Sequence, residues 1–575
     1  MTIPIAGYRT LIEALEAAPP ERLFVLEWHD ENDRHAVTFG EFRDRSAAWA
    51  SFLRQQGARS GEQVAFILKQ SIGLMAAFAG AMRIGALPAI LAYPSAKVEH
   101  NKYRSGLRGI SANLQAPLLV VDEAFPEELL VELAAGASAN IVRATLSPHP
   151  RVTASSEPAA PASGDSLAFL QHSSGTTGLQ KGVALTHRAV LRQLGHLIEA
   201  LKIGEDDKLY SWLPLYHDMG LIACFLLPMV CHLPVVMQTP TEWVQRPSTM
   251  LYLIRQHRCT LAWMPNFAFQ FIPRRTPEEE RARIDLSSLR ALINCSEPVR
   301  AQSMEEFRAA FAGCGLRKGA LQSSYAMAEN VFAVTQSDEN GPLTIHVDAR
   351  RFRSEGVVEE VAAGTPGAVA LISSGRLLAG NRARIISGQD EAVGSSESLP
   401  ELRVGEILIQ SDSLFAGYHG RPELTAEVMK DGWYCTGDLG FFCREELFVV
   451  GRKKDLLIIG GENIYPQDVE EAVCAHPGIH DGRAVAIGLL NAELGTEDLA
   501  VVAEVETAEL LGQKKQIERE IRAAVLVQVG VAVRFLFLKP PKWIVKSTSG
   551  KASRSGTREK LLSEHPELAA RDASL

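Results

Sequence analysis

Apolar and polar positions divide the first part of the chain into short strands and amphipathic helices. Apolar runs lie at residues 23–26, 63–68, 89–92, 118–121 and around Val142. The longer stretches between these runs repeat apolar residues at the spacing of a helix. Strands that alternate with helices are typical of α/β domains, so we expect an α/β fold with largely parallel sheets.

Side-chain chemistry marks the starts of two of the predicted helices. Thr38 is followed three residues later by Glu41, which is the spacing of a capping box, and this helix should end near Gly57. Thr186 follows the apolar run at 183–185 and is a suitable cap for a second helix. Both predictions concern local structure only.

A run of small and hydroxyl-bearing residues separates two predicted strands, at 166–170 and 183–185. Glycine permits positive φ, and Ser and Thr hydroxyls add donors to the backbone N–H groups, so such a loop can wrap an anion, with Lys181 at its edge. The pattern indicates the phosphate loop of a nucleoside-triphosphate site, although a flexible linker has a similar composition. The loop residues are Ser173, Ser174, Gly175, Thr176, Thr177 and Gly178.

Spacing distinguishes this loop from two commoner nucleotide-binding motifs. A Walker loop requires a second glycine at the position that Gln180 occupies here. The nearest match to a dinucleotide-binding fingerprint, at residues 313–319, contains one residue too many. The loop therefore belongs to another class of nucleotide site.

Composition and charge exclude several classes of protein. The 575 residues are 46% hydrophobic and 22% charged, as in globular proteins with large cores, and the net charge of −9 gives no reason to expect nucleic-acid binding. The N-terminus has no signal-peptide pattern, and prolines interrupt the most apolar run, residues 221–237, so we expect no transmembrane segment. The eight cysteines form no C-x-x-C pair, which favours reduced thiols and a cytoplasmic location.

Two stretches in the middle of the chain have more than one interpretation. His217 and Asp218 are adjacent and can orient a carboxylate or phosphate oxygen, but such a pair is often a structural hydrogen bond. A metal site is less favoured because no third ligand follows at a useful spacing. The aromatic stretch 263–269 is either core or the lining of an apolar pocket.

Later stretches carry groups that suit a bound nucleotide. Tyr325 offers a flat face for a base, and Glu329 offers a hard oxygen ligand for Mg²⁺. Asp438 lies in a Thr-Gly-Asp turn, where a carboxylate suits the hydroxyls of a ribose but is also common in turns generally. The charged block from Gly451 is typical of a domain boundary with a hinge. Lys551 lies in a polar, glycine-bearing loop near the C-terminus. Such a loop can carry a functional lysine, but it can also be a solvated basic tail.

In this order, the motifs resemble those of the adenylate-forming superfamily of acyl-CoA synthetases, nonribosomal-peptide adenylation domains and luciferases. The phosphate loop is similar to that of the superfamily, and five motifs in register over about 380 residues are not a chance match. The four later motifs are Tyr325-Ala326-Met327-Ala328-Glu329, Tyr434-Cys435-Thr436-Gly437-Asp438, Gly451-Arg452-Lys453-Lys454-Asp455 and Ser549-Gly550-Lys551.

Within the superfamily the chain looks most like the fatty acyl-AMP ligases, which make acyl-adenylates for acyl carrier proteins. Residues 213–222 are close to their form of one motif, and residues 346–376 look like the extra stretch that hampers CoA thioester formation in these ligases. The chain departs from their pattern at 460–464, where its Gly-Gly-Glu-Asn-Ile sequence is more usual in CoA synthetases, at Ala326 and at Cys295-Ser296.

The resemblance implies a ligase that activates a fatty acid with ATP and Mg²⁺, releasing pyrophosphate and forming an acyl-adenylate. The acyl group would then pass to the phosphopantetheine thiol of a carrier protein. The fold implied is a large N-terminal adenylation domain of stacked α/β sheets, residues 1–453, and a small mobile C-terminal α+β domain, residues 454–575.

The resemblance also implies a role for each motif residue. The phosphate loop and Lys181 would hold the β- and γ-phosphates, and Thr176 and Glu329 would be ligands of Mg²⁺. Lys551 would bridge the carboxylate and the α-phosphate, with His217 beside the reacting carboxyl group.

The nucleoside and the hinge would be served by a second set of residues. Tyr325 would stack on adenine, Asp438 and Arg452 would bind the ribose, and Lys454 would be the hinge about which the C-terminal domain rotates. The nucleotide site would be completed by Ser296, Glu297 and Ala326.

Charge gives a separate indication of the acceptor. Between Lys514 and Lys560, twelve Lys and Arg residues stand against three Glu residues, and a basic surface would attract an acidic carrier protein. The same charge also suits ATP phosphates or a solvated face. The alternatives are a fatty acyl-CoA synthetase and a catalytically silent adenylate-binding protein, and the intact Lys551, Glu329 and Asp438 argue against the silent protein.

Overall fold

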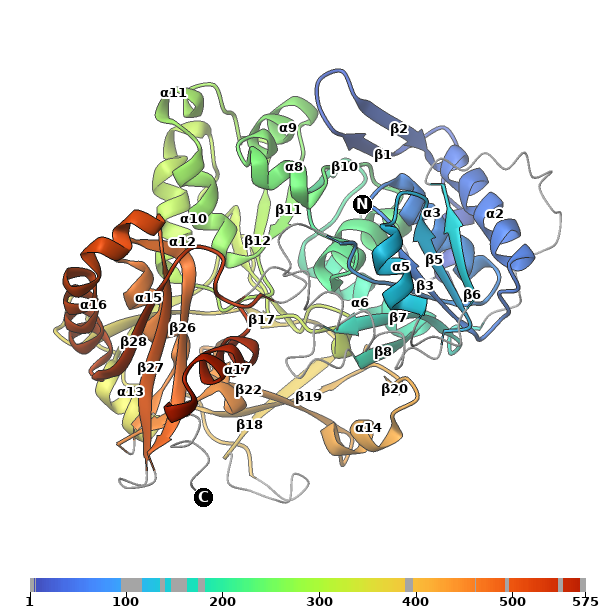
Figure 1. The fold of residues 1–575 in the computed structure, drawn as a ribbon. Helices are drawn as coiled ribbons and strands as arrows, with labels where there is room; N and C mark the ends of the chain where they lie inside the picture. The colour runs from blue at the N-terminus through green and yellow to red at the C-terminus, as the bar shows by residue number, and fades with distance from the viewer. Residues whose placement is uncertain are drawn as a thin grey trace.

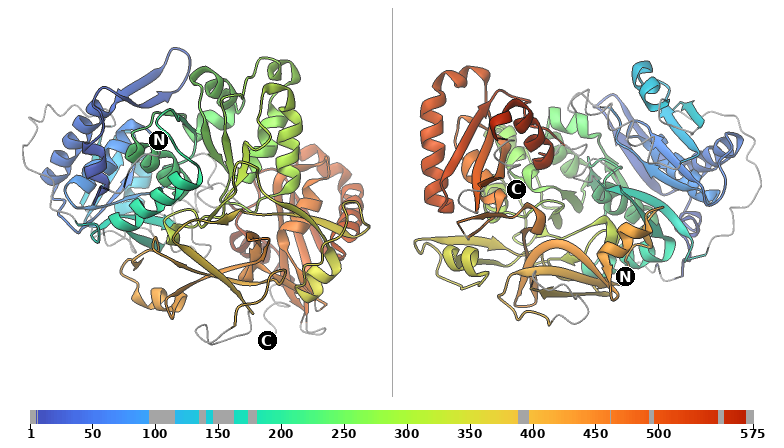
Figure 2. Two further views of the ribbon diagram at one scale, coloured as in Figure 1. Left: turned by 180° about the vertical axis from the view of Figure 1, so that it is seen from behind. Right: turned by 60° about the horizontal axis from the view of Figure 1, so that its bottom comes forward.

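The structure is a computed structural model of the chain. It describes residues 5, 7–94, 116–134, 140–145, 163–173, 181–387, 397–460, 462–491, 496–546 and 552–568. Figure 1 shows a large body, coloured from blue to yellow and light orange, beside a smaller C-terminal lobe in dark orange and red. The lobe lies to one side of the body in both views of Figure 2 as well.

The first sheet of the body has seven strands in the order β13-β12-β11-β9-β10-β1-β2. Neighbouring strands are parallel except in the β1–β2 hairpin. The strands are β1 (Leu23–Trp28), β2 (Arg34–Thr38), β9 (Leu209–Ser211), β10 (Val235–Met237), β11 (Leu261–Met264), β12 (Ala291–Asn294) and β13 (Leu321–Ser323). Because β9, β11, β12 and β13 are parallel, the loops that follow them leave the same edge of the sheet.

The second sheet is entirely parallel, in the order β4-β3-β5-β6. Its strands are β3 (Gln63–Ile67), β4 (Leu87–Ile90), β5 (Leu118–Asp122) and β6 (Asn140–Ala144). Helices α2 (Phe39–Gln55) and α3 (Ile72–Arg83) precede β3 and β4. The capping box of Thr38 and Glu41 is confirmed at the start of α2, which ends two residues before Gly57.

The predicted strand–loop–strand around the phosphate loop is a hairpin. Strands β7 (Leu167–Ser173) and β8 (Lys181–Thr186) are antiparallel, and β20 (Gly417–Tyr418) pairs with the other edge of β8. Thr186 accepts a hydrogen bond from the backbone of Ala189 and caps α6 (His187–Ala200), as predicted.

The third large sheet is antiparallel, so the expectation of largely parallel sheets holds only for the first two. Its order is β14-β17-β23-β22-β19-β18. Arg444 and Glu445, both with positive φ, form the two-residue turn between β22 and β23, and so short a connection can join only antiparallel strands. The strands are β14 (Thr335–Gln336), β17 (Arg376–Leu377), β18 (Asn381–Ile386), β19 (Gly405–Ser411), β22 (Trp433–Cys443) and β23 (Glu446–Arg452).

The C-terminal lobe has apolar clusters of its own, whose buried members all lie after Leu456. They fill the space between a three-stranded sheet and the helices on its faces. The elements are β24 (Leu457–Ile459), β25 (Glu462–Ile464), α15 (Pro466–Cys474), β26 (Ile479–Asn491), β27 (Thr496–Val505), α16 (Lys514–Val529), β28 (Val533–Lys539) and α17 (Arg554–Glu564). A large body and a small lobe with a mixed sheet agree with the predicted fold class.

The segment that resembles an extra stretch forms a small unit beside the lobe. It contains β15 (Thr344–Asp348), α13 (Ala349–Glu355) and β16 (Ala368–Ile372). Phe352 stacks on Tyr465, with ring centroids 5.5 Å apart. The buried Arg353 donates a hydrogen bond of 2.8 Å to the backbone carbonyl of Val529, at the end of α16. The segment therefore links the body to the lobe.

The most apolar run of the sequence lies in the core, as expected. It forms the π-helix η1 (Met219–Leu226), the helix α7 (Leu227–Cys231) and strand β10. Among the described residues, no helix has both the length and the apolar character needed for a membrane crossing.

Candidate functional site

One cavity of about 2570 Å³ lies at the edge of the first sheet and reaches the C-terminal lobe. Its wall includes the segments that follow β9, β11, β12 and β13, together with Asp438 in the middle of β22 and residues at the end of β23. Every predicted site residue whose side chain the structure describes lines this cavity. These residues are Lys181, His217, Ser296, Glu297, Tyr325, Ala326, Glu329, Asp438, Arg452 and Lys454.

Asp438 is at the centre of one polar group in the cavity. It faces Arg452 across the antiparallel strands β22 and β23, and its Oδ1 lies 3.2 Å from Arg452 Nε. The Tyr325 hydroxyl donates a hydrogen bond of 2.5 Å to Oδ2. Burial raises the pKa of the Asp438 carboxyl, against the lowering effect of Arg452 and Tyr325. The three residues come from distant parts of the sequence and form one polar wall.

Glu329 and Lys181 belong to a second polar group, joined by Tyr418. The Tyr418 hydroxyl donates a hydrogen bond of 2.8 Å to Glu329 Oε1. Lys181 Nζ lies 4.6 Å from the centroid of the Tyr418 ring, which places the ammonium over the aromatic face. The pairing of β20 with β8 brings Tyr418 beside Lys181. The Tyr418 side chain therefore contacts a cation at its ring face and a carboxylate at its hydroxyl.

His217 and Asp218 form the structural pair that one interpretation of the sequence proposed. His217 Nδ1 lies 2.6 Å from Asp218 Oδ1. The same Oδ1 accepts a hydrogen bond from the backbone N–H of Met219, the first residue of η1. The pair also lines the cavity, so the structural contact fixes the imidazole at the wall of the site.

The loop after β12 has an unusual backbone at its first site residue. Ser296 adopts a φ of 68°, which is uncommon for a residue other than glycine. Glu297 accepts a hydrogen bond of 3.0 Å from the backbone N–H of Phe267, in the first turn of the helix (Asn266–Arg275) that follows β11. Ala326 forms an isolated bridge with Ala333. These contacts tie neighbouring loops together along the cavity edge.

Lys454 lies in the short helix η4 (Lys453–Asp455), where the body meets the lobe. Next to it, Asp455 pairs with Arg554 at 3.2 Å, and Arg554 also pairs with Glu470 of α15 at 2.7 Å. Arg554 opens helix α17. The start of α17 is thereby attached to the predicted hinge.

Two predicted parts of the site lie outside the described residues. They are Ser174, Gly175, Thr176, Thr177 and Gly178 of the phosphate loop, and Lys551. Ser173 is the last residue of β7, and only its backbone is described. The neighbours of both missing segments line the cavity: His172 and Lys181 for the loop, and Lys546 and Ala552 for the lysine.

An apolar region adjoins the polar groups. Trp212 lines it and stacks on Trp243, with centroids 3.6 Å apart and planes 2° from parallel. Phe267 and Phe271 of α10 (Asn266–Arg275) also line it, whereas Trp263 is buried in the core. Within the aromatic stretch 263–269, Trp263 is therefore part of the core and Phe267 lines the pocket, so each of the two interpretations holds for one of these residues.

Sequence patterns did not reveal two important contacts of the site. Tyr418 links Lys181 to Glu329, but it lies in a two-residue strand with no motif that marks it. Arg554 lies three residues after Lys551 and was one of many basic residues there. Tyr418 gains its partners from the pairing of β20 with β8, and Arg554 gains its partners from ion pairs with Asp455 and with Glu470 of α15.

Comparison with known proteins places the chain in a family. The model of the family described as AMP-binding enzyme matches residues 13–419. A long-chain-fatty-acid–AMP ligase, FadD32 of Mycolicibacterium smegmatis, is 32% identical over 91% of this chain and 88% of its own. The medium-chain-fatty-acid–[acyl-carrier-protein] ligase JamA of Moorena producens is 30% identical over 92% and 91%.

A solved structure agrees with these relatives. It comes from a study of fatty acyl-adenylate ligases of E. coli and L. pneumophila, and it is similar to this chain with a TM-score of 0.89 at 26% identity, over 99% of this chain and 100% of its own. The resemblance inferred from the motifs is thereby confirmed along the whole chain. This chain belongs to the AMP-binding enzyme family, and its relatives in that family include fatty-acid–AMP ligases.

Proposed function

We propose that this protein is a fatty acid–AMP ligase that activates a fatty acid with ATP and transfers the acyl group to a carrier protein. The observation that carries the proposal is the cavity of about 2570 Å³ whose wall contains Lys181, Glu329, Asp438 and Arg452 beside an apolar region. The polar part suits a nucleotide triphosphate, and the apolar part suits an alkyl chain. The names of the relatives FadD32 and JamA support the same assignment.

The first step joins two anions, so the site must neutralise charge and fix geometry. A carboxylate oxygen attacks the α-phosphorus of ATP, and the bond from that phosphorus to the β-phosphate oxygen breaks and releases pyrophosphate. Lys551 would neutralise the charge that develops between carboxylate and α-phosphate. The phosphate loop and Lys181 would hold the departing phosphates, and His217 would orient the carboxylate.

The nucleoside part of ATP would be held by the Asp438 group. Asp438 would accept hydrogen bonds from the ribose hydroxyls, and Arg452 would support it as a charged partner. Tyr325 would stack on the adenine while its hydroxyl keeps Asp438 in place. Ser296, Glu297 and Ala326 would complete the wall around the base.

Glu329 fits a role as a ligand of Mg²⁺. One of its oxygens accepts the Tyr418 hydrogen bond, and the carboxylate has a second oxygen to offer a cation at the cavity wall. Thr176, which lies outside the described residues, would be the other protein ligand. When bound, Mg²⁺ supplies positive charge to the phosphates that leave.

The second step would require the C-terminal domain, residues 454–575, to rotate about Lys454 and admit a thiol. The thiol sulfur attacks the acyl carbon, and AMP leaves. A carrier protein is favoured as the acceptor because residues 346–376 resemble the stretch that hampers CoA thioester formation, and this stretch contacts the lobe through Phe352 and Arg353. We place this reaction in the cytoplasm, which agrees with eight free cysteine thiols, all within the described residues.

CoA is the second candidate acceptor, favoured by the sequence at 460–464. Incubation of the protein with Mg-ATP, dodecanoic acid and CoA, followed by mass spectrometry, separates the possibilities. Acyl-AMP without acyl-CoA supports the carrier-coupled ligase, and a phosphopantetheinylated carrier protein should then become acylated. Abundant acyl-CoA would replace the proposal by the CoA synthetase, and the absence of acyl-AMP would leave only a nucleotide-binding role.

A further inference from the structure

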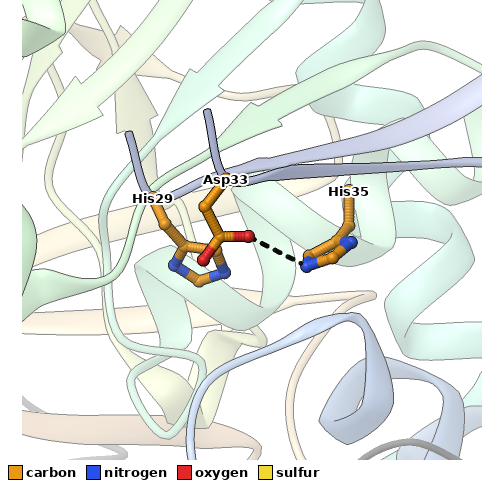
Figure 3. A group of neighbouring side chains, drawn as sticks. All are labelled: His29, Asp33 and His35. Atoms are coloured by element: carbon orange, nitrogen blue, oxygen red, sulfur yellow. Dashed lines mark ion pairs between the residues drawn. The ribbon is translucent and has the colours of Figure 1, made fainter. Parts of the chain in front are cut away.

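A second group of polar side chains lies on the β1–β2 hairpin, away from the nucleotide-binding residues. His29, Asp33 and His35 each offer one ligand atom, and these atoms lie within 4.8 Å of one another. Figure 3 shows the three side chains pointing toward one another. The only ion pair drawn joins Asp33 Oδ1 to His35 Nε2 at 3.2 Å. Two imidazoles and a carboxylate are a common set of ligands for transition metals.

The hairpin register is what brings these residues together. The backbone N–H of His29 donates to the carbonyl of Asp33, and Glu27 pairs directly with His35 across the two strands. Directly opposed residues on an antiparallel pair have neighbouring side chains on one face. Strand pairing therefore places Glu27 opposite His35, while His29 and Asp33 are joined by a backbone hydrogen bond in the short loop that connects the two strands.

His29 is held on its far side by a carboxylate from another element. Its Nδ1 lies 2.6 Å from Glu242 Oε1, in helix α8 (Pro240–Gln245). Glu242 is itself fixed, because its Oε2 accepts a hydrogen bond from the backbone N–H of Thr239 in a capping box. When Nδ1–H donates this hydrogen bond to the carboxylate, Nε2 of the neutral imidazole keeps its lone pair available for a metal ion.

Glu27 supplies an independent observation at the same place. Its side chain is buried, with 6% of the residue exposed, and Oε2 accepts a hydrogen bond of 3.1 Å from the backbone N–H of Ile72. Its Oε1 lies 3.6 Å from His29 Nε2, which is too long for a hydrogen bond. A buried carboxylate oxygen directed at this nitrogen is costly without a cation nearby.

We propose that His29, Asp33, His35 and Glu27 form a binding site for one Zn²⁺ ion. Zinc takes four nitrogen and oxygen ligands in a tetrahedron at about 2.0–2.2 Å. The exposed side chains of Asp33 and His35 can close around the ion by rotation, while His29 and Glu27 are already fixed. The ion tightens the hairpin against α8 at the rim of the cavity, which His29, His35 and Glu242 line.

The test is equilibrium dialysis of the whole, metal-stripped protein against Zn²⁺. The amount of bound metal is measured by inductively coupled plasma mass spectrometry. We expect one Zn²⁺ per chain at micromolar concentrations. His35→Gln and Asp33→Asn each remove an exposed ligand and should weaken binding at least about tenfold. The matched control is His565→Gln, which breaks a histidine–carboxylate pair with Glu567 in the C-terminal lobe and should change nothing.

Two further readouts distinguish a built site from a surface histidine. Glu242→Gln removes no ligand, yet it should weaken binding about tenfold because Glu242 orients His29. Zn²⁺ should raise the melting temperature of the wild type but not of His35→Gln, whose melting temperature without metal should match the wild type. Wild-type protein that retains no stoichiometric Zn²⁺, or variants that bind it as tightly as the wild type, would overturn the proposal.

Discussion

Single residues of the site owe their properties to partners from distant segments. Asp438 is buried between Arg452 and Tyr325, so its carboxylate is fixed in position before any nucleotide arrives. His187 has a comparable dependence on its surroundings, because its Nδ1 accepts the backbone N–H of Leu11 from the N-terminal helix. For each of these residues, one substitution tests the role of its surroundings.

Asp438→Asn should impair nucleotide binding. The amide removes one acceptor for the ribose hydroxyls and leaves the Arg452 charge unpaired, so the KM for ATP should rise about tenfold or more. The measurement compares the rate of pyrophosphate release with ATP and with 2′-deoxy-ATP. The preference for ATP should be smaller in the variant than in the wild type. Asp412→Asn is the control, since Asp412 pairs with His196 outside the cavity wall. Unchanged discrimination in Asp438→Asn would refute the ribose contact.

Stability should fall in mild acid because of His187. Burial lowers the pKa of His187 to about 4, with the Glu13 charge acting in the opposite direction. In the unfolded chain the imidazole has its ordinary pKa of about 6.5, so between pH 7 and pH 5 the unfolded state binds a proton that the folded state does not. The free energy of unfolding should therefore fall by about 2 kcal/mol over this range. The midpoint of urea unfolding, followed against pH, measures the loss. His187→Gln keeps an acceptor for Leu11 and should show a shallower pH dependence; an equal slope would contradict the argument.

At the scale of elements, parallel strands gather the site. The segments that follow β9, β11, β12 and β13 bring His217, Phe267, Ser296 and Tyr325 to one edge, although these residues are far apart in the sequence. The antiparallel hairpin of β22 and β23 then places Asp438 opposite Arg452. The α13 segment adds contacts between the body and the C-terminal lobe, through Phe352 and Arg353.

Loosening α13 should let the C-terminal lobe move more freely. Arg353→Met keeps the bulk of the buried side chain but removes the hydrogen bond to Val529 and the ion pair with Asp468. We expect the ratio of acyl-CoA to acyl-AMP, measured by mass spectrometry, to rise at least severalfold. Arg351→Met is a matched control on the same helix, because Arg351 pairs only with Glu355 and Glu359 among the described residues. A ratio that stays constant in Arg353→Met would argue against this restraint.

At the scale of the whole molecule, the proposed mechanism divides the work between body and lobe. The residues proposed to hold the nucleotide lie in the body, and the lobe supplies the segment that contains Lys551. The residues flanking that segment, Lys546 and Ala552, line the cavity, and Arg554 attaches α17 to Asp455 and Glu470. The lobe can therefore affect the first step without taking part in adenine or ribose recognition.

Lys551→Ala should nearly abolish acyl-AMP formation, by about a hundredfold or more, because one charge on the transition state is lost. ATP binding, measured by calorimetry, should be mostly retained. Transfer from added acyl-AMP to a carrier protein should also survive, because that step does not use the α-phosphate contact. Lys515→Ala, on the exposed side of α16, is the control. Normal acyl-AMP formation in Lys551→Ala would exclude this role.

The sequence by itself determined the local features and the family. Caps at Thr38 and Thr186, the apolar runs of the parallel strands and each single motif follow from residues close together in the chain, and the order of the motifs along the chain identified the family. These features depend on backbone geometry and short-range hydrogen bonds, which a sequence pattern records directly.

Only the tertiary structure decided which side chains meet. Tyr418 lies between Lys181 and Glu329 because β20 pairs with β8, Arg353 reaches Val529 because α13 packs beside the lobe, and His29 meets Glu242 because α8 approaches the β1–β2 hairpin. The antiparallel third sheet was also missed, since short apolar runs read alike in parallel and antiparallel strands. Such contacts depend on the packing of whole elements, which no local pattern encodes.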